Sequence, residues 1–241
     1  MPRFFVDEPV GSFFRITGED AIHIAKSLRM RVGETLVLCH GGVDHTCKII
    51  NFEQNAVLVE LMSAQPCVAE PKVSVTLFQG LPKGDKMELI VQKAVEVGVC
   101  AIVPMLTKRC VSRPDEKSLQ KKVQRWQKIA LEAAKQSGRG IIPKVFAASE
   151  FSQVIERVAQ KECRVLFYEA GGEPLSNLLK HVPELISIFV GPEGGFDKEE
   201  VALAEKNGVN ICSLGRRILR TETAAIVASA LAIYEVERED L

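Results

Sequence analysis

Two patterns of hydrophobic and polar residues follow one another along the chain and meet near residue 70. In the first, short β-prone runs are expected as strands over 35–39, 46–52 and 56–64. Loop residues between the runs suit hairpins. Before the runs, residues 18–34 predict a helix that ends in basic residues. We therefore predict a small β-domain over residues 1–70, built as a barrel or a sheet.

After a linker with two prolines (64–72), predicted strands and helices alternate. Strands are expected over 73–80, 100–106, 144–148, 163–170, 185–191 and 209–215. Helices are expected over 85–98, 117–137, 149–160, 173–181 and 197–208, with a last one beginning near Thr223. Such alternation predicts an α/β fold over residues 71–241, with a mostly parallel sheet covered on both faces.

Several expected helices begin with residues that suit a helix start. Asp85 with Glu88, and Asp197 with Glu200, have the spacing of capping boxes. Thr221 suits a cap of the last helix. One explanation of its arginine-rich approach is therefore a capped buried helix whose arginines face solvent.

Composition limits the class of protein. The chain of 241 residues is 46% hydrophobic and 26% charged, as in soluble globular proteins. No apolar run approaches the roughly 20 residues of a membrane helix, and the first residues lack a signal-peptide pattern. Seven scattered cysteines suggest reduced, buried thiols in a cytoplasmic protein. The grouping of Cys39, His40, His45 and Cys47 fits no zinc pattern, so no metal is expected.

Charge is balanced overall but not along the chain. The formal net charge is zero, which gives no sign of a nucleic-acid partner. Between Thr107 and Lys144, however, eleven Lys or Arg stand against three acids, a local excess of eight positive charges. This run is typical either of a solvated helix face or of a phosphate-binding surface.

Three expected strands end in glycine-rich or polar loops, at 168–172, 191–195 and 214–222. Ligands of parallel sheets bind beyond the carboxyl ends of strands. The loop VGPEGGF (190–196) lacks the spacing of a phosphate loop or a dinucleotide loop, and GLPKGDK (80–86) also misses the phosphate-loop spacing. Each loop alone suits a tight turn as well as a ligand site.

Five segments taken together resemble one family. In order they read HIAKSLRMRVGE, LPKGDKMELIVQKAVEVGV, RWQKIALEAAKQSGRG, FVGPEGGF and LGRRILRTETAA. They are similar to the RsmE family, the 16S ribosomal RNA (uracil-N3)-methyltransferases of the SPOUT superfamily. The resemblance spans nearly the whole chain. Lys135 stands where the family pattern has an acid, which makes that helix more basic.

The resemblance implies an architecture and an activity. It implies a PUA-like β-barrel RNA-binding domain over 1–70 and a SPOUT α/β domain with a deep trefoil knot over 71–241. It further implies methylation of N3 of a specific uridine in 16S rRNA. The RNA is expected within the small ribosomal subunit, but the sequence does not reveal whether free rRNA or the assembled subunit is the substrate. S-adenosyl-L-methionine would be the cofactor and S-adenosyl-L-homocysteine the product. The enzyme would be a cytoplasmic homodimer without a membrane partner.

The resemblance also implies site residues. Those expected to bind the cofactor are Tyr168, Glu169, Val190, Gly191, Pro192, Glu193, Gly194, Leu214, Gly215, Arg217, Ile218, Leu219 and Thr223. Arg220 would stabilise negative charge on the uracil oxygens. Either Glu222 or Thr221 would accept or relay the N3 proton. Apart from the resemblance, we expect cations of both domains to contact RNA, namely Arg3, Lys26, Arg29, Arg113, Lys122, Arg125 and Arg139.

Two other functions remain open at this point. A SPOUT enzyme of this kind could modify a different position, such as a ribose 2′-hydroxyl. A non-catalytic RNA-binding or ribosome-assembly module would explain the first domain and the basic helix. That module would leave the three glycine-rich or polar loops without a use.

Overall fold

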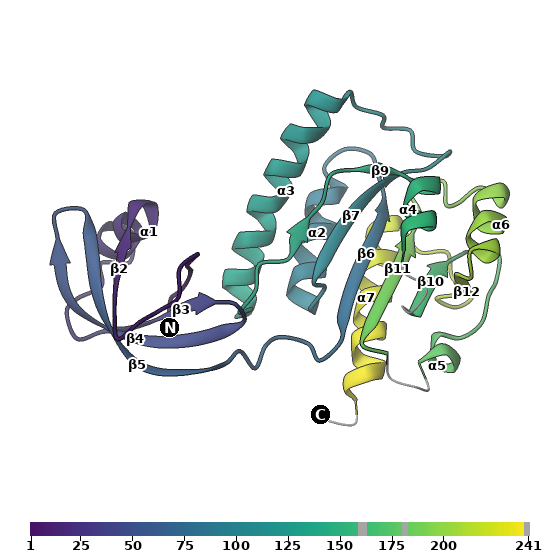
Figure 1. Cartoon of the computed structure of the whole chain (residues 1–241). Coiled ribbons are helices and arrows are strands. Elements are labelled where there is room, and N and C mark those ends of the chain that lie inside the picture. Colours follow the sequence, from purple (N-terminus) through teal and green to yellow (C-terminus); the bar gives the residue numbers. More distant parts are fainter. Residues whose placement is uncertain (159–162, 180–182, 239–241) are drawn as a thin grey trace. The chain divides into compact units, whose positions relative to one another are not determined.

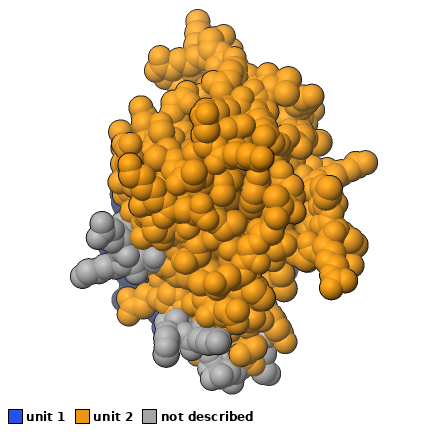
Figure 2. Space-filling model, turned by 90° about the vertical axis from the view of Figure 1, so that its right-hand side faces the viewer, with its two compact units in different colours: residues 1–70, 134–142 blue, residues 71–133, 143–241 orange. Residues whose placement is uncertain are grey.

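The computed structural model describes residues 1–158, 163–179 and 183–238 and separates into two compact units. Unit 1 contains residues 1–70 and 134–142, and unit 2 contains the rest of the chain. Figure 2 colours the two units separately. The chain first leaves unit 1 between Glu70 and Pro71. Residues 134–142, which lie inside the expected domain 71–241, belong to unit 1 instead.

A five-stranded sheet forms the body of unit 1 (Figure 1). Its order is β1 (Arg3–Phe5), β3 (Thr35–His40), β4 (Val43–Glu53), β5 (Ala56–Pro66), β2 (Phe13–Thr17). β1 runs parallel to β3, and the other neighbours are antiparallel. The three predicted strands are confirmed, and β1 and β2 are additions. Buried side chains of the core include Ile24, Leu36, Leu38, Ile49 and Val59.

The prediction of a helix over 18–34 is wrong for the second half of that range. Helix α1 (Gly18–Ile22) continues only as a π-helical turn (His23–Ser27). Arg29 then takes a left-handed backbone conformation with φ of 51°, which a continuing helix does not permit. The next residues form a turn, closed by a hydrogen bond from the Glu34 amide to the Arg31 carbonyl.

A buried ion pair fastens residues 134–142 into unit 1. The Arg139 side chain is 2% exposed, and its guanidinium donates to both carboxylate oxygens of Glu70, at 2.9 and 2.7 Å. Glu70 Oε1 also accepts from the amides of Gly140 and Ile141. Burial opposes ionisation of Glu70, but the hydrogen bonds and charge of Arg139, together with the two backbone amides, outweigh it and lower the Glu70 pKa.

Unit 2 is an α/β unit with a seven-stranded sheet in which every pairing is parallel. The strands run in the order β12 (Asn210–Cys212), β10 (Cys163–Phe167), β11 (Leu185–Val190), β6 (Ser74–Gly80), β7 (Ala101–Leu106), β8 (Lys144–Val145). β9 (Ser149–Glu150) also pairs with β7. The predicted α/β class and parallel sheet are therefore confirmed.

Helices cover both faces of this sheet, as Figure 1 shows. α2 (Lys86–Val97) packs with α7 (Thr221–Glu237), and α4 (Phe151–Arg157) packs with α6 (Lys198–Lys206). The other two helices are α3 (Glu116–Ser137) and α5 (Leu175–Leu178). All six match expected helices, although α4 and α5 are shorter than expected. Residues 159–160 and 180–181 of those expectations lie outside the described residues.

Only one of the three expected side-chain caps is present. Asp197 and Glu200 form the predicted capping box at α6. Asp85 precedes α2 without a side-chain cap, because its backbone (φ −97°, ψ 9°) lies outside the extended region of a capping residue. Glu88 pairs instead with Arg125 at 2.8 Å. At α7 the prediction is also wrong: Arg220 occupies the capping position and Thr221 is the first helical residue.

The cysteines of the chain are free thiols. All seven cysteines are free, and five of them are buried. Burial raises the pKa of Cys39 to about 11, so this thiol stays protonated near neutral pH. Within residues 1–158, 163–179 and 183–238, no helix is long and apolar enough to span a membrane, and no acid, His and Cys cluster could hold a metal ion.

Candidate active site

The three loops that follow β10, β11 and β12 meet at one pocket of about 560 Å³. It lies beyond the carboxyl ends of these strands, where ligands of parallel sheets bind. Its wall consists of Lys86, Phe167, Tyr168, Glu169, Val190, Gly191, Pro192, Glu193, Gly194, Gly195, Ser213, Leu214, Gly215, Arg217, Ile218, Leu219, Arg220, Thr221 and Ala224. The sheet topology thus joins loops that are far apart in the sequence.

Close backbone approaches explain the glycines of the loop after β11. A Cβ atom at Gly191 would lie 3.0 Å from backbone atoms of Gly195. Gly195 itself has φ of 66°, and a Cβ there would lie 2.7 Å from a Glu169 carboxylate oxygen. These positions therefore need glycine, and the pocket wall on this side consists largely of backbone.

Buried hydrogen bonds fix the start of α7 against this loop. The Thr221 hydroxyl donates to the Gly191 carbonyl at 2.7 Å and accepts from the Gln79 amide at 3.0 Å. Gln79 is fully buried at the end of β6, and its amide also donates to the Gly191 carbonyl. The hydroxyl hydrogen of Thr221 is thus engaged by the Gly191 carbonyl.

An ammonium group links two carboxylates at the edge of the pocket. Lys86 Nζ lies 2.9 Å from Glu193 Oε1 and 3.4 Å from Glu222 Oε2. The hydrogen bond with Glu193 raises the pKa of Lys86. Burial opposes ionisation of Glu193, but the hydrogen bonds from Lys86 and from backbone amides, together with the charge of Lys86, outweigh it and lower the Glu193 pKa. We call this group the Lys86 bridge, and it connects the loop after β11 to α2 and α7.

Comparison with known proteins decides the family. Residues 69–233 match the RNA methyltransferase domain, and residues 16–62 match the RNA methyltransferase PUA domain. Ribosomal RNA small subunit methyltransferase E of Bacillus subtilis (strain 168) is 36% identical over 233 residues, which is 93% of this chain and 91% of that protein. The chain belongs to the ribosomal RNA small subunit methyltransferase E family. The RsmE resemblance of the sequence is confirmed.

Further relatives agree. The Mesomycoplasma hyopneumoniae (strain 232) member is 34% identical over 226 residues, 94% of this chain and 96% of its own length. A crystal structure of the Neisseria gonorrhoeae member, bound to S-adenosyl methionine, superposes with a TM-score of 0.87 at 30% identity. It covers 96% of each chain. The chain is thus an RNA methyltransferase by family, with both domains of its relatives.

Among the residues expected to bind the family's cofactor, all but Thr223 lie on the pocket wall. The Ile218 side chain, expected to pack on a ligand, is 86% exposed. The wall also contains residues that the sequence did not single out, namely Lys86, Phe167, Gly195, Ser213 and Ala224. The sequence around Lys86, GLPKGDK, matches no phosphate-binding pattern, and nothing in it signals the contact of Lys86 with the two distant carboxylates.

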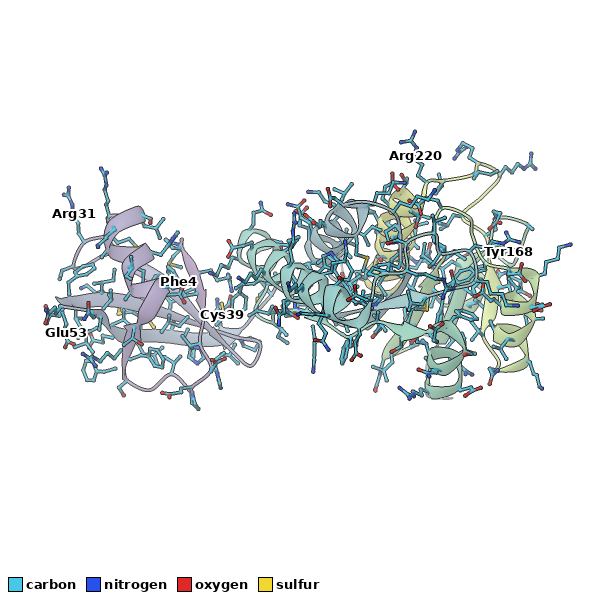
Figure 3. All side chains as sticks on the ribbon, turned by 90° about the horizontal axis from the view of Figure 1, so that it is seen from above. Phe4, Arg31, Cys39, Glu53, Tyr168 and Arg220 are labelled. Carbon is cyan, nitrogen blue, oxygen red and sulfur yellow. The ribbon has the colours of Figure 1, made fainter. Side chains whose placement is uncertain are left out.

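The three expected catalytic residues are neighbours but do not share one environment. Arg220 and Thr221 line the pocket, whereas Glu222 does not. Figure 3 shows Arg220 projecting from the ribbon of unit 2, and Arg220 makes no ion pair with any carboxylate in the described part of the chain. Glu222 Oε2 is buried and, within the described residues, its polar contact is the ion pair with Lys86 at 3.4 Å and not a hydrogen bond.

The seven expected RNA-contacting cations fall into two groups. Arg139 is buried against Glu70, and Arg3 is paired with Asp44 at 2.8 Å, both inside unit 1. In this structure both guanidinium groups are engaged by carboxylates of unit 1. The others lie at exposed or half-buried positions and are Lys26, Arg29, Arg113, Lys122 and Arg125.

Proposed function

We propose that this chain transfers the methyl group of S-adenosyl-L-methionine to N3 of a specific uridine in the 16S rRNA of the small ribosomal subunit. The observation that carries the proposal is the single pocket formed by the three loops after β10, β11 and β12 in a member of this family. S-adenosyl-L-homocysteine would be the second product. The N. gonorrhoeae relative, crystallised with S-adenosyl methionine, supports the cofactor.

The residues of the pocket fit this cofactor. Glycine-rich walls bring backbone donors and acceptors close to a ligand, and Leu214 and Leu219 supply apolar surface. The carboxylates of Glu169 and Glu193 favour a ligand that carries positive charge, as a sulfonium and an ammonium group do. Bound there, the cofactor supplies an electrophilic methyl group. The protein contributes chiefly by holding N3 of the uracil in line with it.

The charged residues at the pocket edge would handle the uracil. Loss of the N3 proton leaves negative charge on the uracil oxygens. Arg220 would stabilise it, since its guanidinium lies on the pocket wall and has no ion pair with a carboxylate among the described residues. Thr221 holds Gly191 and has no free hydrogen, so we assign it a positioning role. Glu222 remains the candidate proton acceptor, and Lys86 holds its carboxylate beside the pocket until substrate binds.

The assembly proposed for this enzyme is a homodimer with a deep trefoil knot in unit 2. Helix α7 is apolar on nearly all sides, and Leu231 and Tyr234 on it are 41% and 55% exposed. A helix of this kind is normally covered. A second copy of the chain is the proposed cover. The knot is proposed from the family resemblance, and the meeting of residues 190–195 with 213–221 at one pocket supports it.

RNA binding and location complete the proposal. Lys26, Arg29, Arg113, Lys122 and Arg125 are proposed to contact rRNA, because their cationic groups lie at the surface or half-buried. A reduced, cytoplasmic setting agrees with seven free cysteines and a ribosomal substrate. The assembled small subunit is the proposed form of the substrate.

Nucleoside analysis tests the function. Small-subunit rRNA that lacks the modification is incubated with the protein and a methyl-labelled cofactor, digested, and analysed by mass spectrometry. The expected product is 3-methyluridine. A labelled 2′-O-methylnucleoside would contradict the N3 assignment and indicate the ribose as the target. Absence of calorimetric heat with S-adenosylmethionine would indicate a non-catalytic RNA-binding module.

A further inference from the structure

A second groove of about 350 Å³ borders helix α3 in unit 2. We call it the α3 groove. Its lining residues are Glu116, Leu119, Gln120, Val123, Gln124, Ala147 and Ala148. None of them belongs to the wall of the methyl-transfer pocket. The groove combines apolar surface with two amide side chains and one carboxylate, so both flat apolar and hydrogen-bonding ligand parts fit it.

Two glutamines of the α3 groove have free hydrogen-bonding capacity, in contrast with a third on the same helix. Gln127 is used by the fold, since its amide donates to Pro143 and accepts from Val145, at 3.0 and 2.9 Å. Gln124 is exposed and makes no hydrogen bond with a described residue. Gln120 makes one long contact, 3.4 Å to Glu116. Such amides match the donor and acceptor edges of nucleobases.

A stripe of cations runs along α3 beside the groove. Lys117, Lys121, Arg125 and Lys128 are spaced by four, four and three residues, which places them on one helix face. All four are exposed. Arg125 pairs with Glu88, whereas the three lysines have no ion pair with a carboxylate in the described part of the chain. The lysines can therefore neutralise phosphates.

An exposed aromatic ring directly precedes the groove residue Ala147 in the sequence. Phe146, which precedes Ala147, is 40% exposed, and Lys144 Nζ lies 4.8 Å from the centre of its ring. Aromatic rings and cations near one another are the elements with which proteins hold unpaired nucleotides. Unit 1 is not enriched in cations, since its residues 1–70 contain six Lys or Arg and nine acids. The α3 surface is thus the stronger electrostatic site.

We propose that the α3 groove binds an unpaired nucleotide of the substrate RNA, outside the methyl-transfer pocket. The base lies against Leu119 and Val123 and is read by the amides of Gln120 and Gln124, while Lys117, Lys121 and Lys128 contact phosphates. This inference rests on the proposed function only in that the ligand is RNA. An acidic peptide is the other occupant with suitable charge, but it makes no use of base-reading amides.

Fluorescence anisotropy with the full chain and a labelled single-stranded RNA of the substrate region tests the proposal. Gln120→Ala with Gln124→Ala should weaken binding about tenfold without changing its salt dependence. Lys117→Glu with Lys121→Glu should weaken binding and reduce the salt slope by about two, one for each lost phosphate contact. Gln153→Ala and Lys206→Glu are the controls, since they replace the same residue types at exposed positions of α4 and α6. They should change neither the RNA affinity nor its salt dependence.

Further measurements separate this inference from the proposed function. Calorimetry with S-adenosylmethionine should give the same affinity for all variants, which excludes a folding defect. In methyl-transfer assays the groove variants should raise the KM for RNA and leave kcat unchanged. If the wild type binds RNA through these residues but transfers no methyl group, the proposed function is wrong and the groove inference stands.

Three outcomes would overturn the inference. Groove variants that bind RNA as tightly as the controls would show that the groove has no part in RNA binding. Loss with the lysine variant alone would show a phosphate-binding surface without a base site. Unchanged RNA binding together with tight binding of a labelled poly-glutamate peptide, lost in the lysine variant, would show a site for acidic peptides.

Discussion

The ammonium group of Lys86 lies 3.4 Å from the buried carboxylate oxygen of Glu222, and the two residues come from different helices. The same ammonium group is hydrogen-bonded to Glu193 in the loop after β11. A residue at the start of α2 therefore contacts one acidic side chain on the pocket wall, Glu193, and one beside the pocket, Glu222. We regard Lys86 as a positioning residue for methyl transfer.

Replacing Lys86 with Met should lower the rate of methyl transfer about tenfold or more, because Glu222 and the loop after β11 lose their common partner. Lys86→Arg should restore most of the rate, since it keeps the charge. Lys93→Met is the matched control, as Lys93 pairs with Glu96 on the same helix and with no other carboxylate of the described residues. Steady-state kinetics with rRNA and S-adenosylmethionine measure all three. Equal rates for Lys86→Met and Lys93→Met would rule out a positioning role.

Glu222→Gln distinguishes a proton acceptor from a structural ion pair. If Glu222 takes the N3 proton, the variant loses rate, and part of that rate returns at high pH as the uracil ionises by itself. If Glu222 only stabilises the start of α7, the free energy of unfolding changes by about 1 kcal/mol or less, and the rate stays near that of the wild type. A pH–rate profile and a thermal melt of the same variant decide between the two.

Arg220→Ala should reduce kcat on the order of 100-fold while the affinity for S-adenosylmethionine stays the same, since the charge it stabilises arises during the reaction. Arg216→Ala is the control, because Arg216 is exposed in the same loop but is not on the pocket wall. Calorimetry and single-turnover kinetics separate binding from chemistry. A fully active Arg220→Ala enzyme would contradict the catalytic assignment.

Gly215 tests whether the loop after β12 needs its backbone conformation. It has φ of 102°, and a Cβ there would meet no atom within 4 Å, so Gly215→Val is disfavoured by backbone strain and not by a clash. The loop should shift and cofactor affinity should fall strongly in calorimetry. Gly33→Val in unit 1 has a comparable φ of 95° and open space, and should leave cofactor affinity unchanged. Equal affinities would show that this loop conformation is not required.

Acid should weaken the attachment of residues 134–142 through Glu70. Because the folded pKa of Glu70 is lowered, its stabilisation is complete above the unfolded value near 4.5 and is lost as pH falls through the folded value. Glu70→Gln should lower the free energy of unfolding by about 3 kcal/mol at neutral pH. Between pH 5 and 3 the variant should lose less of its stability than the wild type does, because it has no carboxylate to protonate at this position. Glu53→Gln, whose partner Arg15 is exposed, is the control. Denaturant unfolding at several pH values measures each variant.

The sequence predicted the order of strands and helices in unit 2 well, because alternating elements report burial on both faces of a parallel sheet. It missed β1 and β2, which are short and follow no strong alternation. It extended the first helix too far, because nothing in the residue pattern signals the left-handed conformation of Arg29. Local propensity identifies elements but not a single unusual dihedral angle.

For the pocket, sequence motifs named most of the wall because glycines and strand ends mark loops that ligands approach. The motifs did not predict the Lys86 bridge, which joins residues more than 100 positions apart. Arg139 was expected to contact RNA, but the structure pairs it with Glu70 in a buried position. A run of charged residues in the sequence does not show which of its members is buried. Such pairings depend on tertiary contacts.

The placement of residues 134–142 has a consequence for how such a gene can recombine. A crossover at codon 70 would exchange the first segment of unit 1 but leave its second segment behind, and so would separate Glu70 from the Arg139 of its own lineage. Chimeras of diverged relatives should therefore fold best when both segments come from one parent. The two parts of unit 1 are expected to be inherited, and to change, as a pair.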